Sequence, residues 1–477
     1  MADRGERPLG TCGRGFWLAA AGIALAGAVL RLAASMGELW FDEIWNLAFI
    51  LPVKSVWGVF TEYDHENNHH LISLWMWLCG DKASWWTYRV PSILSGVLAI
   101  VVAMRIGLRQ SQAAAVVAGI LFSLSYLMVV YSSEARGYGI ACCMALVAYD
   151  CLEANLTRGT WKSAAGYGLA VVLGMMGSLS FISIAGALGI WASYELYRQQ
   201  GIKCLPRLIG LQLGPVTALG VFWMVSLRHV TRGVGPDVWL WSIMGETASY
   251  VMGLPGYTAL GLLLLPGILA CVAWEVNRLR KAGDSRWVVF ACGIVVLPAL
   301  VLMGTGRIYI FPRYFLVNIA LLMLMGALVL GRLWDEGQRA RKLCVAAGLA
   351  GWALGNGMLD ANLCRVGRGH FLDALKFVVN SSNGSDVFIG SVQDSRLRLL
   401  TLFYERYLPP QNRPILVQVS DVSTERPPWI ISTISHYEGV SLPEQLRPDV
   451  GLTYTLVRGF PAIKLSGFEF GVYARSP

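Results

Sequence analysis

Residues 16–34, FWLAAAGIALAGAVLRLAA, and the nearby residues 37–46, GELWFDEIWN, decide the fold of this chain. The first segment is about 19 residues long and apolar, which is enough for a helix to cross a bilayer. The second begins where that helix would leave the membrane, and it places adjacent carboxylates, Asp42 and Glu43, among aromatic side chains. A carboxylate that aromatic neighbours partly desolvate is suited to act as a general base. The alternative is an ordinary solvated acidic pair in a loop.

The composition is that of a polytopic membrane protein. The 477 residues are 55% hydrophobic and only 14% charged, with a mean hydropathy of +0.53 and 18 Trp, whereas soluble domains average about 25% charged residues. The formal net charge of +9 is spread over short loops. This distribution indicates the basic loops of one membrane face, and we expect no nucleic-acid partner. The ten cysteines show no disulfide or metal-binding spacing.

Further apolar runs predict an all-α polytopic membrane protein with about eleven spans. Each run is long enough, or nearly so, to cross the hydrocarbon layer as a helix. The predicted spans cover residues 16–34, 89–108, 112–131, 135–153, 162–178, 180–197, 208–227, 257–276, 287–304, 313–333 and 342–358.

The loop charges predict the orientation of these spans. With the N-terminus in the cytoplasm, the cytoplasmic loops hold most of the basic residues, such as Arg105, Arg109, Arg278 and Arg280. The opposite loops are poorer in Lys and Arg and include every long connection. The positive-inside rule therefore places the long first loop, residues 35–88, and the tail on the outer face. We expect an integral protein of a bacterial inner membrane, with its active site and C-terminal domain on the periplasmic side.

Two domains are expected: a transmembrane catalytic domain over residues 1–359 and a small α/β domain on the outer face over residues 360–477. The tail alternates turn signals with short β-prone runs, and it is large enough for a small core. It contains no Gly-rich phosphate loop, metal-ligand spacing or triad, so we expect an accessory role. The expected elements are a helix at 372–380, strands at 386–391, 414–419, 429–434, 454–457 and 468–473, and interfacial helices at 44–59 and 71–79 in the first loop.

The first outer loop also contains a polar cluster at residues 63–71, YDHENNHHL, which holds three of the six histidines. Imidazoles beside carboxylates can bind a divalent metal, transfer protons or bind a phosphate. The spacing matches no specific metal motif, so a divalent metal stays an open alternative, as does an ordinary hydrogen-bonded turn. We predict a polar substrate cleft lined by His65, Asn68 and His69.

A further element, residues 131–138 with the sequence YSSEARGY, lies at the outer junction of two predicted spans. Ionisable groups at membrane depth are costly and are commonly functional. We therefore expect Arg136 to bind an anion, with Tyr131, Glu134 and Tyr138 lining the cleft. A local pair of Glu134 and Arg136 near the headgroups is the alternative.

A second arginine, Arg313, opens another span on the same predicted face. It follows Pro312, which favours a helix start. Backbone N–H groups at a helix N-terminus, together with a guanidinium group, suit a phosphate. We expect Arg313 to bind a phosphate, with Tyr314 beside it in the cleft.

Taken in order, these motifs resemble glycosyltransferase superfamily C, the polytopic enzymes that use polyprenyl-phosphate-linked sugars. The similar branch is that of the protein O-mannosyltransferases (family 39-like) and the lipid A aminoarabinose transferases. The resemblance covers most of residues 16–358. The sequence has a run of Asn and His at residues 67–70 where many relatives have a His-Pro-Pro-type turn. The motifs that carry the resemblance are Asp42-Glu43, Asn68-His69, Arg89-Val-Pro-Ser92, the Tyr131–Tyr138 element and Arg313-Tyr-Phe315.

The resemblance implies an inverting transferase that moves one sugar, a hexose or a pentose, from a polyprenyl phosphate to an acceptor glycan, lipid or protein. Asp42 would deprotonate the acceptor, with Glu43 as its supporting partner. Arg136 and Arg313 would hold the lipid phosphate, and His69 would line the cleft on the acceptor or phosphate side. This chemistry is coherent because phosphate leaves as an anion, so one base and cationic groups suffice.

Two other classes of protein are alternatives. A secondary transporter or flippase would handle a lipid or small solute, and such proteins commonly show inverted repeats with charges near the midplane. The sequence shows no internal symmetry, and its notable charges gather at one predicted face. A non-catalytic scaffold that binds through its tail is the third class. The sequence identifies neither the sugar nor the acceptor.

Overall fold

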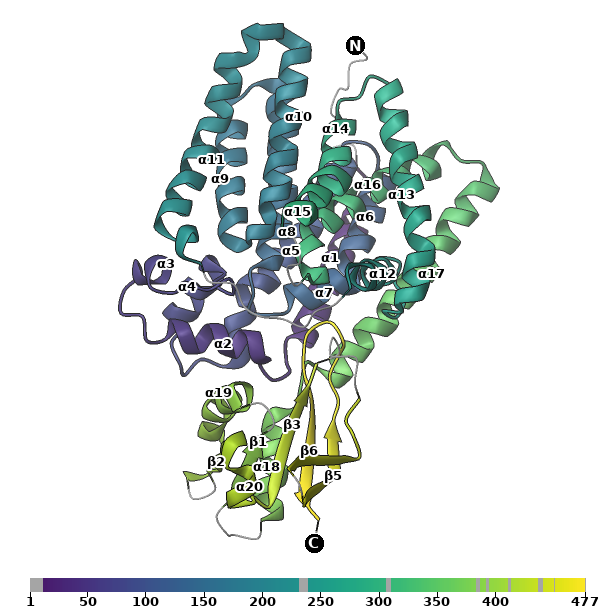
Figure 1. The fold of residues 1–477 in the computed structure, drawn as a ribbon. Coiled ribbons are helices and arrows are strands. Elements are labelled where there is room, and N and C mark those ends of the chain that lie inside the picture. Colours follow the sequence, from purple (N-terminus) through teal and green to yellow (C-terminus); the bar gives the residue numbers. More distant parts are fainter. Residues whose placement is uncertain are drawn as a thin grey trace. The chain divides into compact units, whose positions relative to one another are not determined.

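The computed structural model describes residues 12–230, 239–305, 310–382, 387–391, 394–410, 413–435, 441–449 and 451–476. Contacts within the chain divide it into two compact units (Figure 1). Unit 1 consists of Met1–Ser35, Ser55–Leu78 and Thr87–Asp360. Unit 2 consists of Met36–Lys54, Cys79–Trp86 and Ala361–Pro477. Part of the first long loop, residues 35–88, therefore belongs with the C-terminal unit, and the division into 1–359 and 360–477 stays a prediction.

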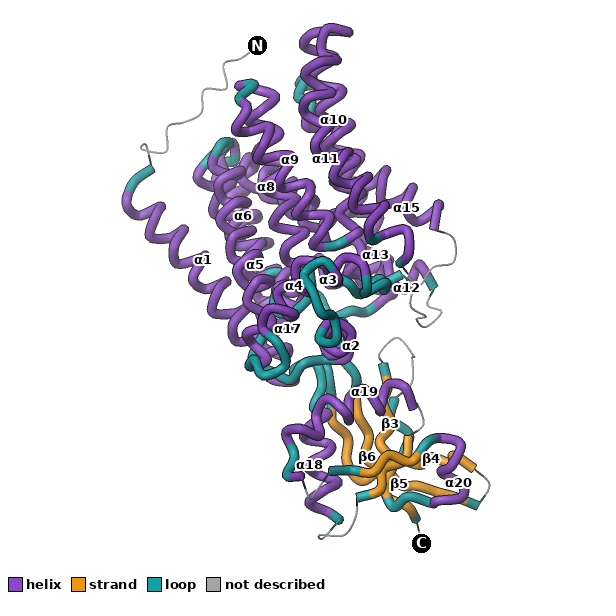
Figure 2. Tube along the Cα trace, turned by 90° about the vertical axis from the view of Figure 1, so that its left-hand side faces the viewer, coloured by secondary structure: helices purple, strands orange, loops and turns teal. Residues whose placement is uncertain are grey.

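Unit 1 is helical, and its helices appear as purple tubes in Figure 2. In chain order its helices are α1 (Arg14–Ala34), α3 (Gly58–Thr61), α4 (His70–Cys79), α5 (Trp85–Leu108), α6 (Gln112–Leu124), α7 (Tyr126–Ser132), α8 (Tyr138–Arg158), α9 (Trp161–Gly177), η2 (Leu179–Phe181), α10 (Ile182–Gln200), η3 (Gly201–Cys204), α11 (Leu205–Val225), η4 (Leu227–His229), α12 (Leu240–Val251), α13 (Thr258–Lys281), α14 (Arg286–Ala291), the π-helix η5 (Cys292–Val296), α15 (Leu297–Thr305), η6 (Pro312–Phe315), α16 (Leu316–Glu336) and α17 (Arg339–Val366). Of these, α4, α5 and α17 cross the border between the units.

The predicted membrane character is confirmed. Among the described residues, seven helical stretches are long and apolar enough to cross a bilayer, or up to eight if the bent pair α6 and α7 is one span. The predicted spans all fall largely on helices. The two counts differ partly because α9 has only 17 residues and because α10 and α11, which only the short helix η3 separates in the chain, count as one stretch. The exact number of spans stays a prediction.

Burial shows which helices form the centre of unit 1. Within the most apolar 18 residues of each helix, the buried share is 72% in α8 and 67% in α16. The same share is only 11% in α1 and 17% in α13. Helices that are apolar on their outer surface are suited to contact with lipid. The centre is packed by aromatic rings, such as Tyr149 of α8 against Trp191 of α10, whose centroids lie 5.3 Å apart. Unit 1 is therefore a membrane bundle around α8 and α16.

A sharp bend between α6 and α7 sets the position of the residues that follow. The two helices meet at 57°. Helix breaks leave backbone groups without intrahelical partners, and here the side-chain oxygen of Asn356 accepts a hydrogen bond of 2.8 Å from the backbone N–H of Tyr126. The buried helix α7 then leads through residues 133–137 into α8, so the 131–138 element forms a compact turn between two buried helices.

Unit 2 is an α/β domain around a mixed six-stranded sheet in the order β2-β1-β3-β6-β5-β4. β1 is parallel to β2 and to β3, and the remaining neighbours are antiparallel. The strands are β1 (Phe388–Ser391), β2 (Ile415–Val417), β3 (Trp429–Ile434), β4 (Gln445–Asp449), β5 (Leu452–Phe460) and β6 (Glu469–Arg475). The helices are α2 (Phe41–Ile50), α18 (Phe371–Ser381), α19 (Asp394–Tyr404), η7 (Glu405–Tyr407), η9 (Val419–Asp421) and α20 (Val422–Glu425).

The sheet of unit 2 buries a small apolar core. Ile430 on β3, Tyr454 on β5 and Tyr473 on β6 are fully buried and form one cluster with neighbouring aliphatic side chains. The predicted small C-terminal α/β domain is confirmed, and β3 matches its predicted bounds. The sequence prediction missed α19 and β4.

Candidate functional site

The acidic pair lies in the first turn of α2, so the helix begins before the predicted start at residue 44. Glu43 is buried, and its Oε2 accepts a hydrogen bond of 3.0 Å from the backbone N–H of Trp40. This carboxylate therefore caps the helix, in the manner of the acidic member of a capping box. Asp42 is partly exposed. Of the pair, Asp42 is thus the carboxylate that a substrate can reach.

Aromatic side chains surround this turn within unit 2. The ring of Phe41 lies 5.3 Å from Trp45 and 5.6 Å from Phe468 between centroids. The guanidinium carbon of Arg396 lies 4.2 Å from the centroid of Phe468. The Tyr404 hydroxyl donates a hydrogen bond of 2.6 Å to the carbonyl of Leu39, just before the helix. The backbone around Asp42 is therefore held in place by packing.

In unit 1, Arg136 and His69 form the centre of a second group of candidate residues. Arg136 is 4% exposed, and its Nη2 donates a hydrogen bond of 2.7 Å to Oδ1 of Asn67. Its guanidinium carbon lies 4.9 Å from the ring centroid of Tyr138, and the His69 ring lies 4.8 Å from the same ring. The structure thus brings the predicted residues Arg136, His69 and Tyr138 together. The alternative, a local pair of Glu134 and Arg136, stays open.

The protonation of His69 follows from its contacts. The carbonyl oxygen of Gly177 lies 2.8 Å from Nδ1, and because a carbonyl only accepts, Nδ1 carries the proton. Burial, with the charges of Arg136 and Arg313, holds the pKa of His69 well below its usual value. The ring is therefore neutral, and its Nε2 carries a lone pair. Nε2 is buried and has no hydrogen-bond partner among the described residues.

Arg313 lies in η6, which leads directly into α16. Its guanidinium carbon is 4.1 Å from the ring centroid of Phe311 and 5.7 Å from that of Tyr314. The aromatic rings orient the guanidinium by cation–π contacts. Because its charge acts on His69, Arg313 belongs to the same group as Arg136.

The remaining predicted tyrosine, Tyr131, is buried with its ring centroid 5.5 Å from that of Tyr138. Its hydroxyl lies within electrostatic reach of Arg313, Glu134 and Glu246, and both carboxylates are buried. Glu246 on α12 was not among the predicted site residues. A carboxylate within a mostly apolar helix of a loop between predicted spans was the signal that could have identified it.

The other residues of the polar cluster at 63–71 stabilise the loop. Asn68 donates hydrogen bonds of 3.0 Å to the carbonyls of Val59 and Tyr63. His70 contacts the Ser226 hydroxyl at 2.8 Å, and the ring of His65 stacks on Tyr63. The histidines therefore point to different partners. Among the described residues, this cluster does not bring metal-ligand atoms together.

Two further residues of the predicted motifs also have structural contacts. Arg89 is fully buried and donates a hydrogen bond of 2.6 Å to the carbonyl of Ser35. The Ser92 hydroxyl donates a hydrogen bond of 2.7 Å to the carbonyl of Arg136. The span start at residues 89–92 therefore supports the backbone at Arg136.

Comparison with known proteins gives a likeness of fold. No protein-family model and no curated protein sequence matches the chain. The structure is similar to ArnT from Cupriavidus metallidurans in the apo state, with a TM-score of 0.51 and 15% identity over 96% of this chain and 98% of that chain. It is also similar to ArnT bound to undecaprenyl phosphate, with a TM-score of 0.50 and 13% identity over 97% and 98% of the two chains. At 13–15% identity this likeness shows the fold alone, and the predicted resemblance to glycosyltransferase superfamily C agrees with that fold.

Proposed function

We propose that this protein is an inverting membrane glycosyltransferase that moves one sugar from a polyprenyl phosphate to an acceptor. The observation that carries the proposal is the grouping of Arg136 and His69 around the ring of Tyr138 in unit 1, with Arg313 near enough for its charge to help lower the pKa of His69. Such a group is suited to an anion that forms when a phosphate leaves. The likeness of fold to ArnT, which has been crystallised with undecaprenyl phosphate, supports a polyprenyl-phosphate donor.

His69 is suited to a different part of the substrate. Because its Nε2 is a hydrogen-bond acceptor, it would repel a fully ionised phosphate oxygen and would accept a hydrogen bond from a hydroxyl group. We therefore assign His69 to a sugar or acceptor hydroxyl, and the phosphate to the two arginines. Tyr131, Glu134, Tyr138 and Tyr314 line this part of the cleft.

Asp42 supplies the general base. It would take the proton of the acceptor nucleophile as that atom attacks the anomeric carbon, and the bond from that carbon to the phosphate oxygen breaks. Direct displacement inverts the anomeric centre, and the lipid phosphate leaves as an anion. The proposed setting is the periplasmic face of a bacterial inner membrane. The acceptor is a glycan, lipid or protein, and the sugar is a hexose or pentose.

The test uses purified full-length protein in lipid with a panel of polyprenyl-phosphate sugars and a cell-envelope acceptor mixture. Release of free polyprenyl phosphate is measured for wild type, for Asp42→Asn and for the control Asp81→Asn, whose side chain is exposed in the same unit. General-base catalysis contributes roughly 10²–10⁴-fold, so Asp42→Asn should lose that factor and Asp81→Asn should not.

Near-normal release by Asp42→Asn would remove Asp42 from the mechanism. If well-folded wild type releases polyprenyl phosphate from no donor, the transferase proposal fails and a transporter or flippase for a lipid or small solute becomes the better explanation.

A further inference from the structure

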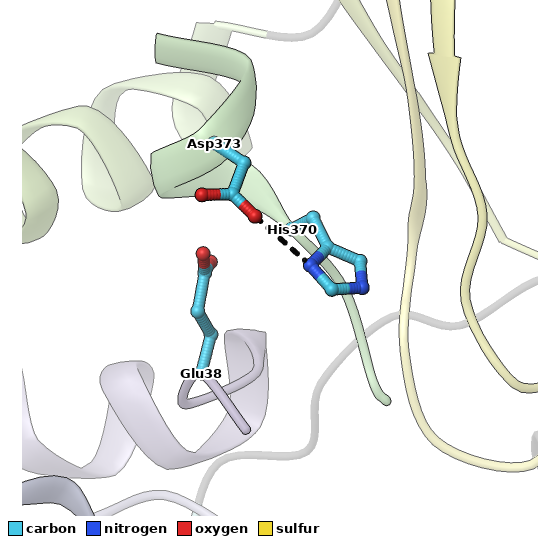
Figure 3. A group of neighbouring side chains, drawn as sticks. All are labelled: Glu38, His370 and Asp373. Carbon is cyan, nitrogen blue, oxygen red and sulfur yellow. Dashed lines mark hydrogen bonds and ion pairs between the residues drawn. The ribbon is translucent and has the colours of Figure 1, made fainter. Parts of the chain in front are cut away.

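Three potential metal ligands gather in unit 2 (Figure 3), and none of them is among the residues assigned to the transfer reaction. Glu38 lies in the segment before α2, His370 directly precedes α18, and Asp373 lies in the first turn of α18. One ligand atom from each side chain lies within 4.8 Å of the other two. Segments more than three hundred residues apart in the sequence thus supply one cluster.

The distances within the cluster fit a small divalent ion. Nδ1 of His370 and Oδ2 of Asp373 are 3.2 Å apart. When two ligand atoms each lie about 2.0–2.1 Å from a tetrahedral ion, the distance between those two atoms is close to this value. Oε2 of Glu38 accepts a hydrogen bond of 3.1 Å from the backbone N–H of Leu372, which holds the carboxylate at the start of α18. The Asp373 side chain is 53% exposed, so it has room to rotate and bring its carboxylate to the same ion as the other two ligands.

The imidazole is also held in a suitable orientation. Nε2 of His370 donates a hydrogen bond of 2.8 Å to the carbonyl oxygen of Val366. Nδ1 lies at hydrogen-bond distance from the Asp373 carboxylate (Figure 3), and a bound metal would take the place of the proton between these two atoms. A backbone carbonyl on the second ring nitrogen is the usual support of a metal-binding histidine. This contact is independent of the grouping of the acidic side chains.

We propose that Glu38, His370 and Asp373 bind one divalent transition-metal ion of the Zn²⁺ class. One imidazole with two carboxylates favours zinc over Ca²⁺ and Mg²⁺, which prefer ligand sets made of oxygen. The bound ion joins the segment that leads into α2 to the start of α18. The site therefore stabilises unit 2, and it does not depend on the proposed transfer reaction.

The test uses tag-free, full-length protein treated with a chelator and then dialysed against Zn²⁺, or against Co²⁺ as a spectroscopic probe. Wild type should bind one ion per chain at this site and gain thermal stability with Zn²⁺, since a ligand that binds only the folded state stabilises it. Glu38→Gln and His370→Ala should each weaken binding by at least about tenfold. The variants His65→Ala and His229→Ala are controls and should bind as wild type does.

The melting temperatures of the metal-free variants show whether a loss of binding reflects unfolding. Glu38→Gln keeps an oxygen to accept the Leu372 N–H, and Asp373→Asn changes an exposed side chain, so at least one ligand variant should remain folded. No binding by wild type, or equal binding by folded Glu38→Gln and His370→Ala, would overturn the proposal. Loss of binding in His65→Ala alone would place the ion in the first-loop cluster and would also overturn it.

Discussion

Asp42 and Glu43 are neighbours in the sequence but have different environments. The Glu43 carboxylate is buried and is bonded to the backbone N–H of Trp40, whereas Asp42 is partly exposed. A carboxylate already committed to capping its own helix is poorly placed to exchange protons with a substrate. We therefore assign the base to Asp42 alone and treat Glu43 as a residue that positions it.

Glu43 substitutions separate these two roles. Glu43→Gln keeps an oxygen for the Trp40 N–H and should retain most of the transfer rate and the melting temperature. Glu43→Ala removes the cap and should cost about 1 kcal/mol of unfolding free energy, with a lower rate because α2 is less well held. Polyprenyl phosphate release and thermal unfolding measure the two effects. A Glu43→Gln variant as inactive as Asp42→Asn would show that Glu43 itself takes part in the chemistry.

His70 makes the stability of unit 1 depend on pH. Its ring lies against Phe60 and Phe222, with centroids 5.4 and 4.6 Å away, and burial lowers its pKa to about 4. The unfolded chain has the ordinary value near 6.5, so the folded state favours the neutral ring. This contribution is present above pH 6.5 and is lost as the pH falls toward 4, by up to roughly 3 kcal/mol.

The expected result is a fall in apparent unfolding free energy between pH 7 and pH 5 that is smaller in His70→Phe than in wild type. His229→Ala removes an exposed histidine and should keep the wild-type pH dependence. Denaturant or thermal unfolding in detergent measures both. An unchanged pH dependence in His70→Phe would contradict the assignment.

At the scale of helices, the close approach of α8 and α9 supports the site. A Cβ atom on Gly137, the residue before α8, would lie 1.8 Å from the carbonyl oxygen of Gly177 at the end of α9. That same oxygen accepts the hydrogen bond from Nδ1–H of His69. Glycine at position 137 therefore permits the contact that fixes the tautomer of His69.

Gly137→Ala should force the two helix ends apart. We expect a loss of about 1–3 kcal/mol of stability and a weaker interaction with the donor, because the Gly177 carbonyl moves away from His69. Gly214→Ala in α11 is the matched control, since its Cβ would meet nothing within 4 Å and alanine favours a helix. Thermal unfolding and donor titration measure the effects. A Gly137→Ala variant as stable as wild type would contradict this packing.

Local patterns in the sequence predicted most of the elements. The apolar runs gave the helices of unit 1, and alternating runs gave most of the strands of unit 2. α19 was missed although Leu397, Leu400 and Tyr404 are buried at helical spacing, whereas β4 contains Pro448, which normally argues against a strand. The predicted start of α2 is three residues late. The residue at the N-cap position is Trp40, whose backbone N–H donates to Glu43, and an aromatic N-cap is not a usual signal for a helix start.

Contacts between distant segments were beyond prediction from the sequence. The candidate residues Asp42, His69, Arg136 and Arg313 came from local motifs, but no pattern indicated that Gly177 would bind His69. Such pairs depend on how helices pack, and packing joins residues with no fixed spacing. For the same reason the cluster of Glu38 with His370 and Asp373 was not foreseen.

At the scale of the whole molecule, the orientation in the membrane is a testable prediction. The basic loops predict that residues 158–162 face the cytoplasm and that the tail faces outward. In a cysteine-free background, an impermeant maleimide should label Thr424→Cys in intact spheroplasts. It should label Lys162→Cys only after permeabilisation, and both side chains are exposed. The reverse pattern would invert the topology and place the proposed reaction on the cytoplasmic face.

Unit 2 is assembled from three separated stretches, and this sets an order of events during biosynthesis. Met36–Lys54, which carries Asp42, leaves the ribosome early, but the strands and helices it packs with come from Ala361–Pro477. Chains are made from the N-terminus at about 5–20 residues per second. The segment with the proposed base must therefore wait tens of seconds for its partners. A nascent chain with its membrane helices already inserted would still lack the partners of α2, so catalytic competence would arrive only after residues 361–477 have been made.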